Sequence, residues 1–159
     1  MEKNKKLIPG LPTGFEDRWD KKLYLKKKLL RLIEENFIKY GFEPLETPSF
    51  EISENIGSFL ADDDSNPMSD VFTFNDGEKN ITLRYDLSSP LARFVAQNNQ
   101  QLPLPYKRYA IQNVFRNEKA GNARYREFTQ ADCDIVGNVN SAQSNAELCN
   151  LIVSTLINC

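Results

Sequence analysis

One stretch of this chain, residues 106–137, combines arginines with an aromatic ring, amides and carboxylates. Guanidinium groups are permanently charged and bind phosphate oxygens in pairs, so several of them close together suit a polyphosphate. An adjacent aromatic ring suits a base through stacking. Phosphate and base together indicate a nucleotide. The polar and aromatic residues concerned are Gln112, Arg116, Glu118, Arg124, Arg126, Phe128, Gln130 and Asp134.

The residue types in this stretch leave two interpretations open. In the first, Gln130 and Asp134 adjoin the nucleotide site and bind a small polar substrate, with the carboxylate accepting from an ammonium group. In the second, the arginines form an exposed ion-pair network on a solvated sheet. The carboxylates available for that network are those of Glu118, Glu127, Asp132 and Asp134. Neither a P-loop nor a dinucleotide-binding glycine motif is present, so those routes to a nucleotide site are disfavoured.

A long antiparallel hairpin is predicted to position these side chains, with its turn at Lys119–Asn122. Glycine and asparagine tolerate the left-handed backbone that such a turn needs. Because side chains alternate between the two faces of a strand, the polar residues above share one face. The opposite face is predicted to be core. It carries Tyr109, Ile111, Phe115, Tyr125, Ala131, Cys133 and Ile135.

Two amphipathic helices are predicted to flank the hairpin. Apolar residues at three- and four-residue steps predict a helix over residues 17–40, which ends at Gly41, and another that is capped by Ser141. The first has an apolar stripe of Trp19, Leu23, Leu30, Ile33 and Phe37. Its lysines are interpreted as a solvated face, comprising Lys21, Lys22, Lys26, Lys27 and Lys28. The stripe of the second is Ala142, Ala146, Cys149, Ile152, Val153, Leu156 and Ile157.

Shorter elements are predicted between the first helix and the hairpin. Residues 42–51 contain two prolines and should be extended, at a sheet edge or an interface. A short helix is expected over residues 52–60, and a second hairpin should join residues 71–74 to residues 81–86. A helix capped by Ser89 should then run to about Asn98.

Asp86 and Ser88 lie at the junction between the second hairpin and this helix. Such junctions often carry functional groups, because the backbone is fixed while the side chains stay accessible. The same two side chains are equally suited to capping the helix. Sequence reasoning favours neither interpretation.

Composition limits the function classes. With 159 residues, 40% of them apolar, the chain can close the core of a single globular domain, and residues 1–14 should be an extended arm. A net charge of −2 gives no general attraction for polyanions. No segment resembles a membrane span or a signal peptide, so a cytoplasmic protein is expected. Three cysteines and no histidine predict neither disulfides nor a protein-ligated metal, and the acidic run 62–64 lacks calcium-loop spacing.

Three segments, in order, resemble a known enzyme family. FRNE at 115–118, followed by RYREFTQ at 124–130, resembles motif 2 of class II aminoacyl-tRNA synthetases, in its histidyl-tRNA synthetase form. The segment from Gly41-Phe42 to Thr47-Pro48 resembles motif 1, within about 41–51. LRYDLSSPLAR at 83–93 resembles the segment of that family which receives histidine, with serine at position 88 where threonine is usual.

The resemblance implies an α/β fold of the α+β type, with an antiparallel sheet flanked by helices, and a role for each site residue. Arg116 would be the catalytic residue, contacting the ATP α-phosphate and the histidine carboxylate. The implied ATP-binding residues are Arg116, Glu118, Arg124 and Phe128. The implied histidine-binding residues are Asp86, Leu87, Ser88, Arg116, Gln130 and Asp134. Motif 2 would occupy about residues 106–137.

The implied reaction joins histidine to AMP, releases pyrophosphate and transfers the histidyl group to tRNA(His). ATP would be a substrate that brings Mg²⁺, and motif 1 would form a homodimer interface. Since no third motif or anticodon-binding part is found, the chain is expected to be an incomplete catalytic domain. The alternative within the same fold is a histidine-sensing regulatory subunit of ATP phosphoribosyltransferase, which does not aminoacylate.

Overall fold

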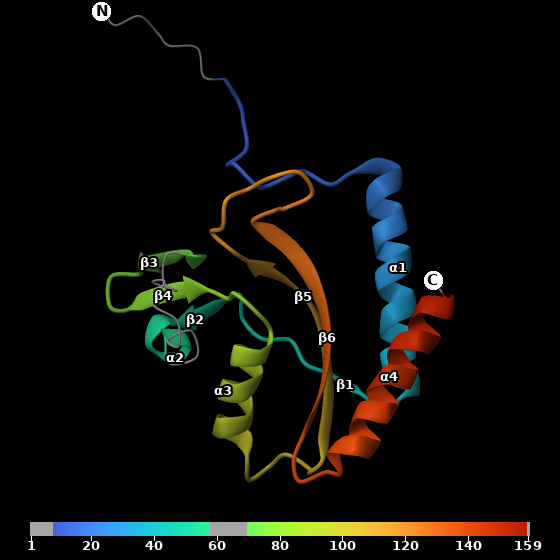
Figure 1. The fold of residues 1–159 in the computed structure, drawn as a ribbon. Helices are drawn as coiled ribbons and strands as arrows, with labels where there is room; N and C mark the ends of the chain where they lie inside the picture. The colour runs from blue at the N-terminus through green and yellow to red at the C-terminus, as the bar shows by residue number, and fades with distance from the viewer. Residues whose placement is uncertain (1–7, 58–69, 159) are drawn as a thin grey trace, which may run out of the picture.

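The computed structural model describes residues 8–57 and 70–158, which form a mixed α/β structure (Figure 1). Its main sheet is built on an antiparallel hairpin of β5 (Tyr106–Phe115) and β6 (Glu127–Val136). Strand β1 (Glu43–Pro44) runs parallel to β5, giving the order β1-β5-β6. The predicted hairpin is therefore confirmed, and so is the edge position of the proline-containing segment.

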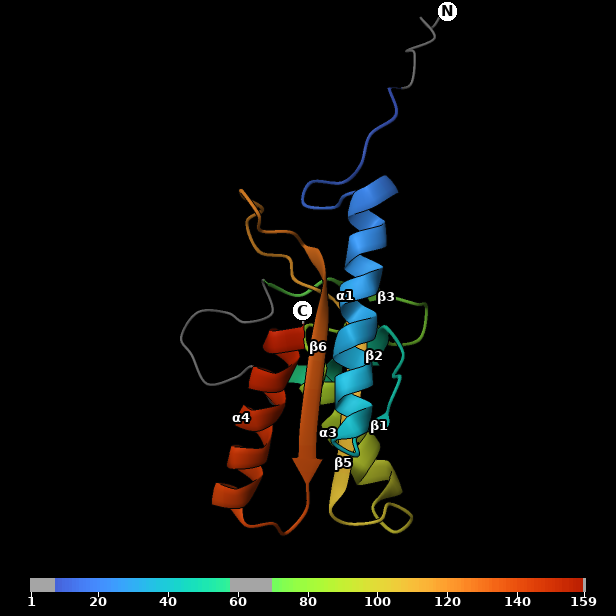
Figure 2. The same ribbon diagram turned by 90° about the vertical axis from the view of Figure 1, so that its right-hand side faces the viewer.

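Helices α1 (Asp20–Lys39) and α4 (Ser141–Asn158) lie side by side on one face of the hairpin (Figures 1 and 2). Both helices were predicted, and Gly41 ends the first with a φ of 77°. The core under them consists of Phe37, Phe42, Tyr109 and Leu151, with Ile111, Cys133 and Ile135 partly buried against it. The predicted core face is shorter than expected, because Ala131 is exposed and Tyr125 lies outside the strands.

A smaller sheet and two helices lie on the opposite side of the hairpin (Figure 1). Its strands β2 (Phe50–Ile52), β4 (Asn80–Leu83) and β3 (Thr73–Asn75) pair antiparallel in the order β2-β4-β3. Helix α2 (Ser53–Gly57) follows β2, and α3 (Ser88–Asn98) follows β4. The second predicted hairpin is thereby confirmed.

Arg84 joins the two sheets. Its side chain is 4% exposed, and its Nε donates to the carbonyl of Asn113 at 2.6 Å while Nη1 donates to that of Thr47 at 2.8 Å. A buried guanidinium is tolerated there because backbone carbonyls accept its protons. The link holds the chain leading into α3 against the hairpin.

The predicted apolar stripe of α4 is exposed rather than packed against the core of the described residues. Ile152, Val153, Leu156 and Ile157 are between 53% and 78% exposed, whereas Leu151 is 1% exposed. The helix is rotated because Asn36 of α1 donates to the Leu151 carbonyl, at 3.1 Å, and to the hydroxyls of Ser154, at 3.0 Å, and Thr155. These hydrogen bonds turn a partly polar face of α4 toward α1.

Three smaller predictions need correction or fall outside the description. Trp19 is 75% exposed rather than core. Lys26 leaves the predicted solvated face, because its Nζ donates to the Thr129 hydroxyl at 2.6 Å. The predicted arm is described only from residue 8, the predicted helix over 52–60 only to Gly57, and the acidic run 62–64 lies outside the described residues. None of the described helices is long and apolar enough to cross a membrane.

Candidate functional site

The strands of the main hairpin are shorter than predicted, so several candidate residues lie in the connection 116–126 rather than on a strand face. Gly121 and Arg124 form an isolated bridge, which puts the tight turn two residues later than predicted. The connection is held from outside the hairpin. The amide of Arg126 donates to the Gly14 carbonyl at 2.7 Å, and that of Asn117 donates to the Asp70 carbonyl at 2.8 Å.

The four residues expected to bind ATP line one cavity of about 330 Å³. Arg116, Glu118, Arg124 and Phe128 share it with Ala123 and Tyr125. The Arg116 guanidinium lies between two rings, 4.4 Å from the ring centre of Tyr85 and 5.1 Å from that of Phe128. Its Nε donates to the Tyr85 carbonyl at 3.3 Å. The cavity therefore offers guanidinium groups, aromatic faces and a carboxylate together.

Glu118 accepts hydrogen bonds from three residues around this cavity. Its carboxylate accepts from the Tyr85 hydroxyl at 3.0 Å and pairs with Arg124, and its carbonyl accepts from Arg126 Nε at 2.9 Å. The hydrogen bond from Arg124 lowers the pKa of Glu118. Burial, followed by the bond to Glu118, raises the pKa of the Tyr85 phenol. Glu118 is thus ionised and Tyr85 neutral at physiological pH.

The ion-pair interpretation of the polar face holds only at two separate pairs, Glu118–Arg124 and Asp134–Arg108. Of the four carboxylates proposed for the network, Glu118 alone pairs with one of the predicted arginines, Arg124. Glu127 instead accepts from the Asn113 amide at 2.8 Å. Among the described residues, Arg116 forms no ion pair. The face is therefore not a solvated ion-pair network.

The residues expected to bind histidine lie along the same face and at the start of α3. Gln130 is paired with Gln112 in the hairpin register, and Asp134 with Arg108. The Gln130 carbonyl oxygen is buried without a hydrogen-bond partner within the described part of the chain. A buried acceptor of this kind suits a ligand that brings a donor, such as an ammonium group.

At the start of α3 the structure matches the capping interpretation. Asp86 accepts from the amide of Ser89 at 3.0 Å and from its hydroxyl at 3.2 Å. The predicted cap, Ser89, is wrong, because the helix begins at Ser88 and Asp86 supplies the capping side chain. Ser88 is exposed and Leu87 is 2% exposed, packed against Ala110 and Val114 of β5.

Two residues of the site, Tyr85 and Arg108, were missed by sequence reasoning, and Asp132 was considered only as a carboxylate of the ion-pair network. Arg108 and Asp132 share the polar face by simple alternation, which is the signal that should have found them. Burial raises the pKa of Asp132, with neighbouring Asp134 and Asp86 adding to the rise and Arg108 opposing it. Three carboxylates and two guanidinium groups, including Arg116, therefore influence one small region.

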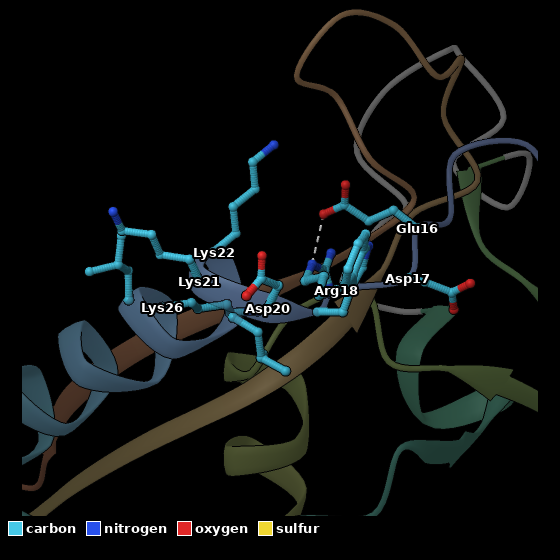
Figure 3. A pocket seen from close by; sticks show the side chains of 10 residues that line it. Glu16, Asp17, Arg18, Asp20, Lys21, Lys22 and Lys26 are labelled. Atoms are coloured by element: carbon cyan, nitrogen blue, oxygen red, sulfur yellow. Dashed lines mark hydrogen bonds and ion pairs between the residues drawn. The ribbon is translucent and has the colours of Figure 1, made fainter.

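A larger cavity of about 640 Å³ lies elsewhere, at the start of α1 (Figure 3). Glu16 and Arg18 form an ion pair of 2.8 Å at its edge, and Lys21, Lys22 and Lys26 line it further along the helix. None of the candidate residues predicted above lines it. A large volume is not by itself evidence of function, so this cavity is not included in the candidate site.

Comparisons with known proteins agree with the motifs. The family model described as Histidyl-tRNA synthetase matches residues 14–159. The chain is 80% identical to a histidine–tRNA ligase of Pelagibacter ubique (strain HTCC1062), over all of this chain and 34% of that protein. It spans about a third of the length of the curated relatives that it matches.

Solved structures show the same similarity. A histidyl-tRNA synthetase from Nostoc sp. PCC 7120 is 29% identical with a TM-score of 0.79, covering 94% of this chain and 34% of that one. A protein of Bacillus halodurans C, described as an ATP phosphoribosyltransferase regulatory subunit/histidyl-tRNA synthetase, is 25% identical with a TM-score of 0.78, covering 98% of this chain and 39% of that one. The mixed α/β fold is therefore that of class II histidyl-tRNA synthetases.

Proposed function

Because this chain belongs to the histidyl-tRNA synthetase family, we propose that it is the amino-terminal part of the catalytic core of a histidine–tRNA ligase. The carboxylate of histidine attacks the α-phosphorus of ATP, the bond to pyrophosphate breaks, and histidyl-adenylate forms. A hydroxyl of tRNA(His) then takes the histidyl group and AMP leaves. The observation that carries the proposal is the shared cavity of Arg116, Glu118, Arg124 and Phe128.

Each residue has a stated role in this proposal. Arg116 neutralises charge on the α-phosphate and orients the histidine carboxylate, while Arg124 binds the outer phosphates. Phe128 stacks on adenine and Glu118 meets the adenine edge. Gln130 and Asp134 bind histidine with the segment Asp86–Ser88. The buried, unpartnered oxygen of Gln130 supports this, since an ammonium group would satisfy it.

Phosphoryl chemistry of this kind depends on positioning and charge neutralisation, so no covalent nucleophile is required. Mg²⁺ enters with ATP and takes most of its ligands from phosphate oxygens and water. The protein is proposed to act in the cytoplasm as a homodimer through motif 1, at about residues 41–51. Motif 2, at about residues 106–137, supplies the ATP side.

A histidine-sensing regulatory subunit of ATP phosphoribosyltransferase is the competing function, because a solved relative described partly in those words shares the fold. The arginines of the cavity favour the ligase, since a sensor of histidine needs no phosphate-binding groups. Histidine-dependent ATP–pyrophosphate exchange by the full-length protein separates the two. Histidine binding without exchange would transfer the assignment to the regulatory function.

Arg116→Ala tests the central role within the ligase. The variant should lose histidine-dependent exchange, because it removes the guanidinium beside the Tyr85 and Phe128 rings that is proposed to neutralise the α-phosphate. Circular dichroism should match the parent protein. Arg31→Ala, on the exposed surface of α1, is the matched control and should retain exchange. Near-normal exchange by the Arg116 variant would refute the phosphate role.

A further inference from the structure

The most deeply buried charged side chain described in this protein is that of Arg108, with an exposed fraction of 0%. It lies on β5, directly opposite Asp134 of β6. Nη2 donates to the Leu87 carbonyl at 2.9 Å and lies 2.8 Å from Asp134 Oδ2. One nitrogen thus contacts both the strand that carries Asp134 and the segment that leads into α3.

Arg108 is only partly satisfied by these contacts. The approach to Asp134 Oδ2 is an ion pair without the alignment of a hydrogen bond, and Nε and Nη1 find no partner within the described residues. A buried guanidinium with unpaired donors lowers the stability of the folded protein, so Arg108 is present at this position despite a free-energy penalty. The carboxylate of Asp134, whose Oδ2 lies 2.8 Å from Nη2, supplies the compensating negative charge.

The burial of Asp134 is uneven in a way that matters for a ligand. Its side chain is 36% exposed, yet Oδ2, the oxygen facing Arg108, is buried. Arg108 approaches only Oδ2, so Oδ1 is the carboxylate oxygen that this ion pair leaves for a ligand. An ion pair that fixes one oxygen leaves the other in a defined direction, which is how an outer contact orients a ligand-binding group.

We propose that Arg108 is a positioning residue for histidine recognition, holding Asp134 and the Leu87 carbonyl in one fixed arrangement so that Oδ1 of Asp134 and the segment Asp86–Ser88 meet the same substrate. This inference rests on the proposed function. Arg108 does not touch histidine itself, because its side chain has no exposed surface. It acts on the histidine half of the site, whereas the cavity lined by Arg116 and Arg124 lies outside its contacts.

Exchange kinetics of Arg108→Met in the full-length protein test the proposal. The KM for histidine should rise about 10- to 100-fold, the equivalent of one lost charged contact, while the KM for ATP changes less than about twofold. Arg31→Met is the control, because Arg31 lies on the exposed surface of α1, outside the segments that carry Asp134 and Leu87. It should leave the ratio of the two KM values unchanged.

Two further variants keep the test decisive. Arg108→Lys retains the charge, so its KM for histidine should lie between those of the unmodified protein and Arg108→Met. If Arg108→Met does not fold, the lysine variant must itself raise the KM for histidine more than the KM for ATP. The double variant Arg108→Met with Asp134→Asn should have a KM for histidine little higher than that of Asp134→Asn alone, because both substitutions disrupt the same Arg108–Asp134 contact.

The outcomes separate the two proposals. An unchanged histidine KM, equal rises for histidine and ATP, or fully additive losses with Asp134→Asn would overturn the role of Arg108 while leaving the ligase intact. Absence of histidine-dependent exchange in the unmodified protein would instead refute the proposed function.

Discussion

If Arg124 exchanges its ion pair with Glu118 for a phosphate of ATP, the exposure of the two side chains sets the free-energy cost of losing the pair. The Arg124 side chain is 65% exposed and that of Glu118 is 20% exposed. An ion pair in water at this exposure contributes about 0–1 kcal/mol. A hydrogen bond from the same guanidinium to a phosphate contributes about 1.5–3 kcal/mol. Exchange of partners therefore favours ATP, by about 1–2 kcal/mol.

Arg124→Ala should accordingly raise the KM for ATP about 5- to 30-fold in the full-length protein, since 1.4 kcal/mol corresponds to tenfold. The KM for histidine should change less than about twofold, because Arg124 has no contact with Gln130 or Asp134 in the structure. The assay is ATP–pyrophosphate exchange with ATP varied at saturating histidine, and Arg31→Ala serves as the exposed control. An unchanged KM for ATP, or equal increases for ATP and histidine, would refute this reasoning.

Two other variants test separate parts of the structure. Gln130→Ala should weaken histidine binding more than ATP binding, because the buried side-chain oxygen of Gln130 has no partner to lose among the described residues. Isothermal titration with each ligand checks this, and equal losses would contradict separate pockets. Asn36→Ala removes the hydrogen bonds from the Asn36 amide to α4, and this should lower the free energy of unfolding by about 1–3 kcal/mol. Hydrogen exchange of the α4 amides should accelerate, and unchanged protection would show that the apolar contact of Leu151 alone holds the helices.

Local patterns predicted the parts of this fold that depend on neighbouring residues. The ten-residue strands β5 and β6 follow from alternation, and the end of α1 follows from Gly41, whose positive φ suits glycine. Alternation predicts that residues 116–126 continue the strands, but two of their backbone amides donate to the carbonyls of Gly14 and Asp70, which are distant in sequence. No local pattern reports such partners.

The orientation of α4 and the role of Asp86 could not be predicted from the sequence, for two different reasons. Hydropathy places the apolar stripe of a helix inward, but the hydrogen bonds of Asn36 turn a face with Ser154 and Thr155 toward α1. In the case of Asp86, the same carboxylate suits a helix cap or a ligand, and the sequence contains no feature that separates the two. The cap is present in the structure, and a ligand would have to share or replace it.

The two halves of the candidate site differ in how firmly they are built. The histidine half stands on regular strands and on the first turn of α3, and the buried Arg108 joins them. In the ATP half, Arg116 is held between two rings and Arg124 is paired with Glu118, so the groups proposed for the phosphates already have partners within the protein. These partners are weak enough to be displaced, because the Arg124 pair is exposed and cation–π contacts at such sites contribute about 0.5–1 kcal/mol. Under the proposed function, Gln130 and Asp134 are therefore preformed for the amino acid, whereas Asp86 and the arginines of the ATP half share or exchange protein partners when the ligands bind.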